Sequence, residues 1–202
     1  QKPDEAHCAH MAEHMVLHYP LKSGSSLSGI LSEAASQGPT YYNGYTGLDS
    51  TVFWLSAPNQ YLPSILTAFL NSLFSHPIIK DAAWDSEIKR SSREIDNITT
   101  NEIHATVNRA RLALLKGTPY AELMFETPLS DVKPEAVSEF VRREYSPARL
   151  TLVITGDWEE EAMFSAIRLG LEGIESGNPP VIRQINLDPD PYSVLRLPSV
   201  QH

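Results

Sequence analysis

The stretch that decides the fold is residues 7–14, His7-Cys8-Ala9-His10-Met11-Ala12-Glu13-His14. It lies in a segment from Glu5 to Tyr19 that contains neither Gly nor Pro and is followed by a proline, which predicts a helix. On a helix, His10 and His14 lie one turn apart on the same face, so both imidazoles can reach one Zn²⁺. Glu13 flanks that face, where its carboxylate can reach a metal-bound water without binding the metal.

Helix geometry alone does not single out this pair of histidines. At about 100° per residue, His7, His10, His14 and His18 all fall within an arc of about 80°. A His pair four residues apart is more often solvated or packed in a core than bound to a metal. We interpret His7 and His18 as rim residues, and Cys8 as a buried, inert thiol because its helix position points away from the pair. A metal-storage or sensor module that uses all four histidines is an alternative.

A catalytic zinc needs a third protein ligand and an open position for water. A second helical pattern runs from Lys80 to Gly117, with a bend expected around residues 97–101. Glu87 and Glu94 lie two turns apart on one face of it, and Glu94 follows His14 by 80 residues. Taken by themselves, the two glutamates are typical of a solvated helix face with basic neighbours as ion-pair partners.

The rest of the chain mixes helical and strand patterns. Helices are expected after the polar loop 23–26 as far as Gly38-Pro39, and over residues 60–74, 134–145 and 159–174. A hairpin is expected over residues 40–46 and 51–57, and a buried strand over 150–155. By alternation, half of the hairpin aromatics face the core. This mixture predicts an α+β fold, an antiparallel-rich mixed sheet with helices packed on it.

Composition limits the function classes. The 202 residues carry 25 acidic against 16 basic side chains, a net charge of −9, which argues against nucleic acid as a partner. A single cysteine excludes an intrachain disulfide. No apolar run approaches the ~20 residues that a membrane span needs. No targeting segment is visible, so the sequence leaves the compartment open.

A wider set of motifs carries a family resemblance. It begins with His10-Met11-Ala12-Glu13-His14-Met15, continues with Asn43-Gly44-Tyr45-Thr46, and adds Glu87 with Glu94. Tyr145-Ser146-Pro147-Ala148-Arg149-Leu150 and then residues 152–157 follow in the same order. Together they resemble the zinc-binding half of the pitrilysin/insulinase family of metallopeptidases, which includes the subunits of the mitochondrial processing peptidase. The resemblance covers roughly residues 4–174 and implies a domain of that fold.

The resemblance also implies roles for individual residues. His10, His14 and Glu94 would bind one Zn²⁺ per chain, with Glu87 as a supporting carboxylate beside them. Glu13 would be the general base that takes a proton from the zinc-activated water and returns it to the leaving amine. The strand Asn43, Gly44, Tyr45 and Thr46 would bind an extended substrate by main-chain hydrogen bonds.

The implied enzyme is a zinc endopeptidase that hydrolyses peptides or unstructured protein segments. It would need a second, inactive pitrilysin-like half, in cis or as a separate subunit. We expect residues 1–175 to form the peptidase domain, without its opening strand, and residues 176–202 to be a Pro-rich linker and the start of a truncated second unit. The alternative is a non-catalytic or structural partner subunit, which would be expected to lack at least one ligand or Glu13.

Overall fold

The computed structural model describes Glu5 and residues 7–18, 26–74, 81–118, 120 and 129–181. Its helices are α1 (Cys8–His18), α2 (Leu27–Ala35), α3 (Leu62–Phe74), α4 (Asp81–Thr100), α5 (Glu102–Leu115), α6 (Pro134–Glu144) and α7 (Glu160–Gly170). Short 3-10 segments are η2 (Asn59–Tyr61), η3 (Leu129–Asp131) and η4 (Pro147–Arg149). The strands β1 (Tyr41–Thr46) and β2 (Thr51–Ser56) form an antiparallel hairpin. The predicted α+β class is confirmed.

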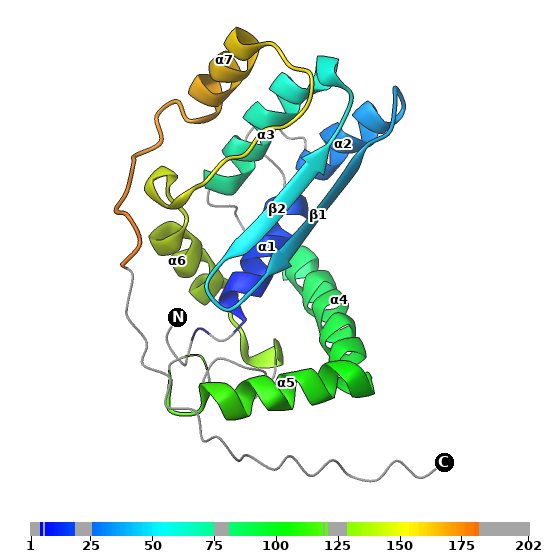
Figure 1. Cartoon of the computed structure of the whole chain (residues 1–202), viewed down its shortest axis with the longest axis vertical. Coiled ribbons are helices and arrows are strands. Elements are labelled where there is room, and N and C mark those ends of the chain that lie inside the picture. Colours follow the sequence, from blue (N-terminus) through cyan, green and yellow to red (C-terminus); the bar gives the residue numbers. More distant parts are fainter. Residues whose placement is uncertain are drawn as a thin grey trace.

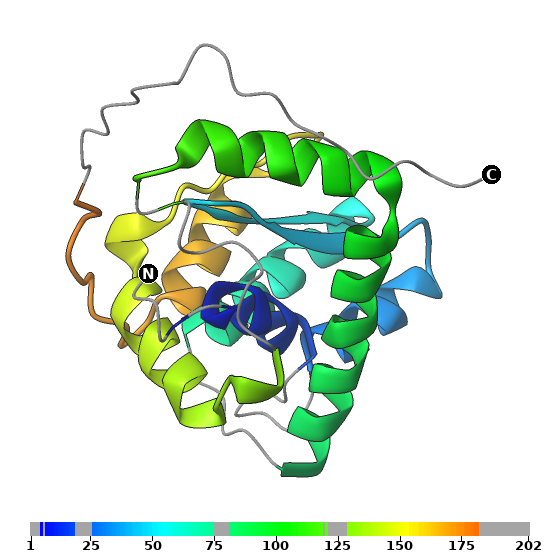
Figure 2. The ribbon, with the colours of Figure 1, turned by 90° about the horizontal axis from the view of Figure 1, so that it is seen from below.

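The helices surround the hairpin in layers. The hairpin crosses in front of α1, and β1 lies on the side of β2 that faces α4 (Figure 1). Helices α4 and α5 meet in an L around the turn of the hairpin, so that α5 lies on one side of the hairpin and α1 on the other (Figure 2). The space between α1, β1 and this L is where the site described below lies.

Helix α1 is buried between two apolar clusters, which fixes its orientation. Met11 and Met15 pack with residues of α4 and α6 in one cluster, and Val16 and Leu17 pack with α2 and α3 in the other. Burial of these apolar side chains stabilises the position of α1 through the hydrophobic effect. The His10/His14 face is left to point at the space between β1 and α4.

The hairpin has the alternation that its sequence predicts. Asn43 is paired with Trp54 and Gly44 with Phe53 in the register of the two strands. Phe53 packs against the core, whereas Trp54 is exposed. The hairpin aromatics therefore divide between core and surface, as expected for a sheet covered on one face.

The expected bend near residues 97–101 is a complete break. Helix α4 ends at Thr100, and the Asn101 side chain caps α5 by accepting hydrogen bonds from the backbone N–H groups of Ile103 and His104, both at 3.1 Å. An asparagine in this position satisfies donors that the first helical turn leaves free. Because of this cap, the chain turns a corner and α5 reaches over the hairpin turn.

The strand expected at residues 150–155 is not formed as a strand. The segment alternates between half-buried and exposed side chains, with Leu152 and Ile154 against the core and Val153 78% exposed. Within the described residues no strand pairs with it, so the extended pattern lacks the ladder that defines a strand. Of the expected linker, residues 176–181 contain no helix or strand, and residues 182–202 lie outside the described residues.

None of the helices that the structure describes is both long and apolar enough to span a bilayer.

Candidate metal centre

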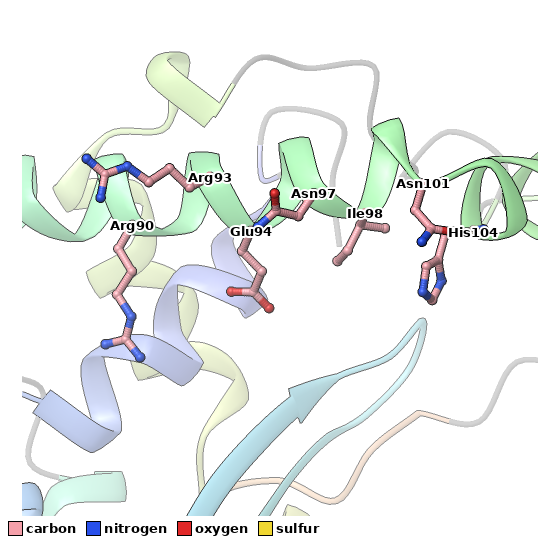
Figure 3. Close-up of a pocket in the computed structure, with 7 residues that line it drawn as sticks. All are labelled: Arg90, Arg93, Glu94, Asn97, Ile98, Asn101 and His104. Atoms are coloured by element: carbon pink, nitrogen blue, oxygen red, sulfur yellow. Dashed lines mark hydrogen bonds between the residues drawn. The ribbon is translucent and has the colours of Figure 1, made fainter.

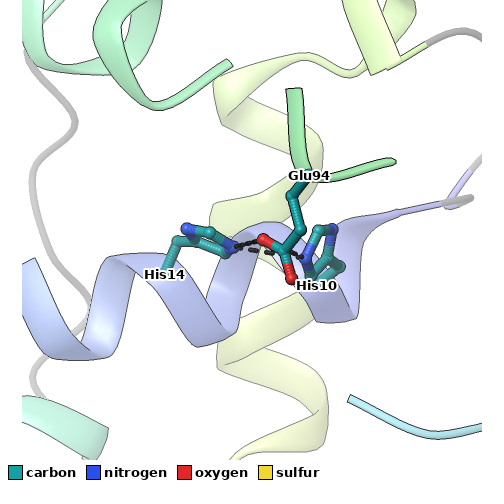
Figure 4. A group of neighbouring side chains, drawn as sticks. All are labelled: His10, His14 and Glu94. Carbon is teal, nitrogen blue, oxygen red and sulfur yellow. Dashed lines mark hydrogen bonds and ion pairs between the residues drawn. The ribbon is translucent and has the colours of Figure 1, made fainter. Parts of the chain in front are cut away.

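Three side chains from two helices converge at one point. His10 and His14 project from α1, and Glu94 reaches between them from α4 (Figure 4). The two histidine Nε2 atoms are 3.2 Å apart. The Glu94 Oε2 atom lies 3.6 Å from His10 Nε2 and 3.4 Å from His14 Nε2. His14 and Glu94, which are 80 positions apart in the sequence, therefore bring the two helices together at this point.

The spacing of these atoms fits a zinc ion. Ligands at about 2.1 Å from a tetrahedral zinc lie about 3.4 Å from one another. The distances between the three atoms, 3.2, 3.4 and 3.6 Å, are close to that value. Two imidazoles and one carboxylate are the protein ligands of one class of catalytic zinc site, in which the fourth position stays open for water.

Glu87 fixes the orientation of His14 from behind. His14 Nδ1 donates a hydrogen bond of 2.6 Å to Glu87 Oε1, so that Nε2 is the nitrogen turned to Glu94. Both side chains are buried, with 7% and 12% of their surfaces exposed. A carboxylate on the second imidazole nitrogen is the usual arrangement behind a metal-binding histidine, because it fixes the tautomer.

The carboxylates also decide the charge of the site. Burial by itself lowers the pKa of His14, but its hydrogen bonds to Glu87 and Glu94 and their negative charges outweigh burial and raise the pKa to about 9. Contacts with the imidazoles of His10 and His14 hold the pKa of Glu94 well below its usual value. In the absence of metal, His14 therefore carries a proton, and its positive charge lies between the carboxylates of Glu87 and Glu94.

Glu13 lies beside the cluster with its carboxylate turned to β1. Only 8% of the residue is exposed. The hydroxyl of Thr46 donates a hydrogen bond of 2.6 Å to Glu13 Oε2. A Cβ atom on Gly44 would lie 2.5 Å from Glu13 Oε1, so the carboxylate lies directly against the strand. Glu13 is close to the histidines in sequence but is held by the strand.

A cleft of about 390 Å³ opens in front of these groups. His10, Glu13 and Glu94 line one end of it, β1 and the hairpin turn line one wall, and α5 lines the other. The α5 wall consists of His104, Val107, Asn108 and Arg111. The sequence predicts no role for these four residues, although their i, i+3, i+4, i+7 spacing marks a single helix face.

A second, more open hollow of about 500 Å³ runs along α4 to the start of α5. It shares Glu94, Ile98 and His104 with the cleft. Figure 3 shows these three side chains pointing to the same side of the two helices, toward α1 and the hairpin turn. The space in front of Glu94 therefore continues along α4 as far as α5.

His7, His18 and Cys8 are other side chains near the histidine pair in the sequence that could bind a metal. His7 lines the cleft at the start of α1, with a backbone φ of +65°. The side chain of His18 lies outside the described residues. Cys8 is fully buried in an apolar cluster, which agrees with the interpretation of an inert thiol. Among the described residues, His10, His14 and Glu94 are the group whose atoms come close enough together to hold a metal.

Comparison with known proteins identifies the family. A family model described as Insulinase (Peptidase family M16) matches residues 1–123. The chain belongs to this family. The matched part of this insulinase-family domain contains the histidine pair, Glu13, β1 and both glutamates of α4. No curated protein matches the chain.

Solved structures share the fold of this insulinase-family domain. The periplasmic protease PqqL from Escherichia coli has a TM-score of 0.75 at 19% identity, over 93% of this chain and 21% of that chain. A mutant of the ferredoxin protease FusC in complex with Arabidopsis ferredoxin has a TM-score of 0.74 at 20% identity, over 91% and 21%. A protease from Helicobacter pylori has a TM-score of 0.74 at 17% identity, over 93% and 45%. The chain thus spans about a fifth of the length of the first two.

Proposed function

We propose that this chain is the zinc-binding domain of a metalloendopeptidase that hydrolyses peptides or unstructured protein segments. The observation that carries the proposal is the convergence of His10, His14 and Glu94, which each offer one ligand atom within 4.8 Å of the other two. The buried Glu13 beside it and family membership both support a hydrolytic site. One zinc per chain is the expected stoichiometry.

Each residue of the site has a distinct task in this proposal. His10, His14 and Glu94 hold the metal, and Glu87 orients His14. Zinc, when bound, acts as a Lewis acid toward a water molecule and the peptide carbonyl. Glu13 accepts the proton of the attacking water and returns it to the leaving amine, as a general base and then a general acid.

In the part of the chain that the structure describes, no strand pairs with the edge of β1 opposite β2, and this edge supports binding of an extended substrate. The N–H of Gly47 bonds to the carbonyl of Ser50, which closes the hairpin, while the N–H of Gly44 bonds to the side chain of Asn43 rather than to β2. Because backbone groups alternate between the two edges of a strand, Gly44 and Thr46 direct theirs away from β2. A peptide in the cleft could pair with this edge by adding a strand. Asn43, Gly44, Tyr45 and Thr46 are the substrate-binding residues in this proposal.

A complete enzyme would include a second pitrilysin-like half, in cis or as a separate subunit. The chain covers only part of each neighbour, 21% of PqqL and 45% of the Helicobacter pylori protease. In this proposal residues 1–175 form the zinc domain and residues 176–202 lead into the next unit. The first of these linker residues are attached to the domain, because Ser176 and Asn178 accept hydrogen bonds from η4.

Substitution of Glu13 tests the proposed activity most simply. Glu13→Gln keeps the shape of the side chain but cannot take a proton. With the second half present, we expect this variant to bind zinc as the wild type does and to lose hydrolysis of an unstructured peptide substrate. Hydrolysis retained in Glu13→Gln would refute the general-base role. A wild-type chain that binds zinc but hydrolyses nothing with its second half present would support the non-catalytic subunit instead.

A further inference from the structure

The carboxylate of Glu13 rests on β1 rather than on its own helix. Thr46 is the last residue of β1 and lies 33 residues from Glu13 in the chain. Its hydroxyl donates to Glu13 Oε2 at 2.6 Å, the length typical of a hydroxyl bonded to a charged carboxylate. Such a bond is stronger and more directional than one between neutral groups. The strand therefore holds one oxygen of the proposed base in place.

Gly44 has no side chain, and this leaves space for the other carboxylate oxygen of Glu13, Oε1. Residues 44 and 46 lie on the same face of β1, because side chains alternate along a strand. A Cβ on Gly44 would approach Glu13 Oε1, Cδ and Cγ to 2.5, 2.8 and 2.8 Å, closer than such atoms pack. Two residues on one face of β1 thus bind the Glu13 carboxylate: Gly44 leaves space for it, and the Thr46 hydroxyl donates a hydrogen bond to it.

The hydrogen bond behind Thr46 has a direction. Thr46 Oγ1 and Thr51 Oγ1 are 3.3 Å apart, and the two residues are paired across the hairpin. A hydroxyl has one proton to donate, and Thr46 gives its proton to Glu13. In the bond between the two threonines, Thr51 is then the donor. The hydroxyl proton of Thr46 is therefore used in the bond to Glu13. The backbone N–H and C=O groups of Thr46 face the edge of β1 opposite β2.

We propose that Thr46 is the positioning residue of Glu13: its hydroxyl, with the space left by Gly44, holds the carboxylate in the orientation needed for proton transfer. This inference rests on the function proposed above. It adds that the strand that receives the substrate backbone also orients the base. Substrate binding and base orientation would then both depend on Gly44 and Thr46.

Thr46→Val is the decisive variant, because valine has the shape of threonine and suits a strand, but has no hydroxyl. With the second half present, we expect kcat to fall by about 10–100-fold, as for a misoriented catalytic group, with KM within about twofold. Zinc stoichiometry should stay at the wild-type value. Thr46→Ser keeps the hydroxyl and should recover most of kcat. A role in substrate binding alone would raise KM instead, and would overturn the inference.

The NMR resonance of the Glu13 carboxyl carbon reports on the bond to Thr46 in the metal-free chain, without any hydrolysis. With ¹³C label in the carboxyl groups of glutamate, loss of the bond to Thr46 should move the Glu13 resonance in Thr46→Val and leave it near its wild-type position in Thr46→Ser. Glu13→Gln assigns the resonance. If Thr46→Val does not fold, the smaller Thr46→Ala takes its place in both measurements. An unmoved resonance in a folded variant without the hydroxyl would overturn the inference.

Thr40→Val is the matched control, because Thr40 lies just before β1 and its hydroxyl bonds only to the Gly38 carbonyl among the described residues. It should leave kcat and the Glu13 resonance unchanged. A wild-type chain that hydrolyses nothing with its second half present removes the proposed function, and hydrolysis in Glu13→Gln removes the general-base role. An inactive Glu13→Gln together with wild-type kcat in Thr46→Val removes the positioning role alone.

Discussion

His14 and Glu87 form the buried pair that joins α1 to α4: Nδ1 of the imidazole donates to the carboxylate at 2.6 Å, and Nε2 is left facing Glu94. This contact connects residues 73 positions apart in the chain. It fixes the side of the imidazole that is available to a metal before any metal is bound. His14 is therefore oriented by a residue that is not part of the His10, His14 and Glu94 group.

Replacing this carboxylate should weaken zinc binding without abolishing it. In Glu87→Gln the amide still has an oxygen that can accept from Nδ1, but it lacks the charge. We expect zinc affinity to fall by about 10–100-fold, the range found for partners of metal-binding histidines. Competition with a fluorescent chelator measures the affinity, and Glu102→Gln, at the start of α5, is the control. Unchanged affinity in Glu87→Gln would mean that Glu87 only packs against His14.

The metal-free domain should lose stability as the pH rises. Unfolded histidine has a pKa near 6.5, whereas His14 in the fold has a pKa of about 9. Because the folded state binds this proton more tightly, the stabilisation is fully present below pH 6.5 and is lost as the pH rises through about 9. Thermal melting of the metal-free chain over this range should show a falling Tm. His14→Gln should show a flatter profile, and a wild-type Tm that rises over the range would contradict the prediction.

Gly44→Ala should displace Glu13 at little cost in stability. The added Cβ meets the far end of a flexible side chain, which can move away without a shift of the backbone. We expect the Tm to change by no more than a few degrees, consistent with less than about 1 kcal/mol. The ¹³C-carboxyl resonance of Glu13 should nevertheless move. A resonance that stays in place would show that the carboxylate does not lie against Gly44 in solution.

Asn101 caps α5 at the corner between α4 and α5. Asn101 accepts hydrogen bonds from Ile103 and His104, so Asn101→Ala should destabilise the domain by about 1 kcal/mol. Asn101→Asp retains the acceptor and is the control. Urea unfolding measures the difference. If Asn101→Ala is as stable as the wild type, the corner is held by packing rather than by the cap.

Much of the site could be predicted because its signals are local. The spacing of His10 and His14 on a helix, with Glu13 between them, is visible in eight residues of sequence. Glu94 could be named only through the family resemblance, since nothing in its own neighbourhood shows that its helix lies against α1. The structure supplies that contact, and with it the distances of 3.4 and 3.6 Å.

What was missed depends on tertiary packing. The α5 wall of the cleft follows from the break at Asn101, where sequence periodicity indicated a bend in one long helix. The expected strand at residues 150–155 has the right alternation, but strand formation also requires a paired neighbour. The bond from Thr46 to Glu13 joins a strand to a helix, and no spacing rule connects them.

Metal analysis of the purified chain decides whether His10, His14 and Glu94 hold one zinc. After dialysis against trace zinc, the wild type and the control His7→Ala should each retain about one zinc per chain, whereas His14→Ala and Glu94→Ala should retain little. A wild type that binds no zinc would show that these three residues do not form a zinc site. So would more than one zinc per chain that persists in Glu94→Ala, which would favour a storage or sensor module.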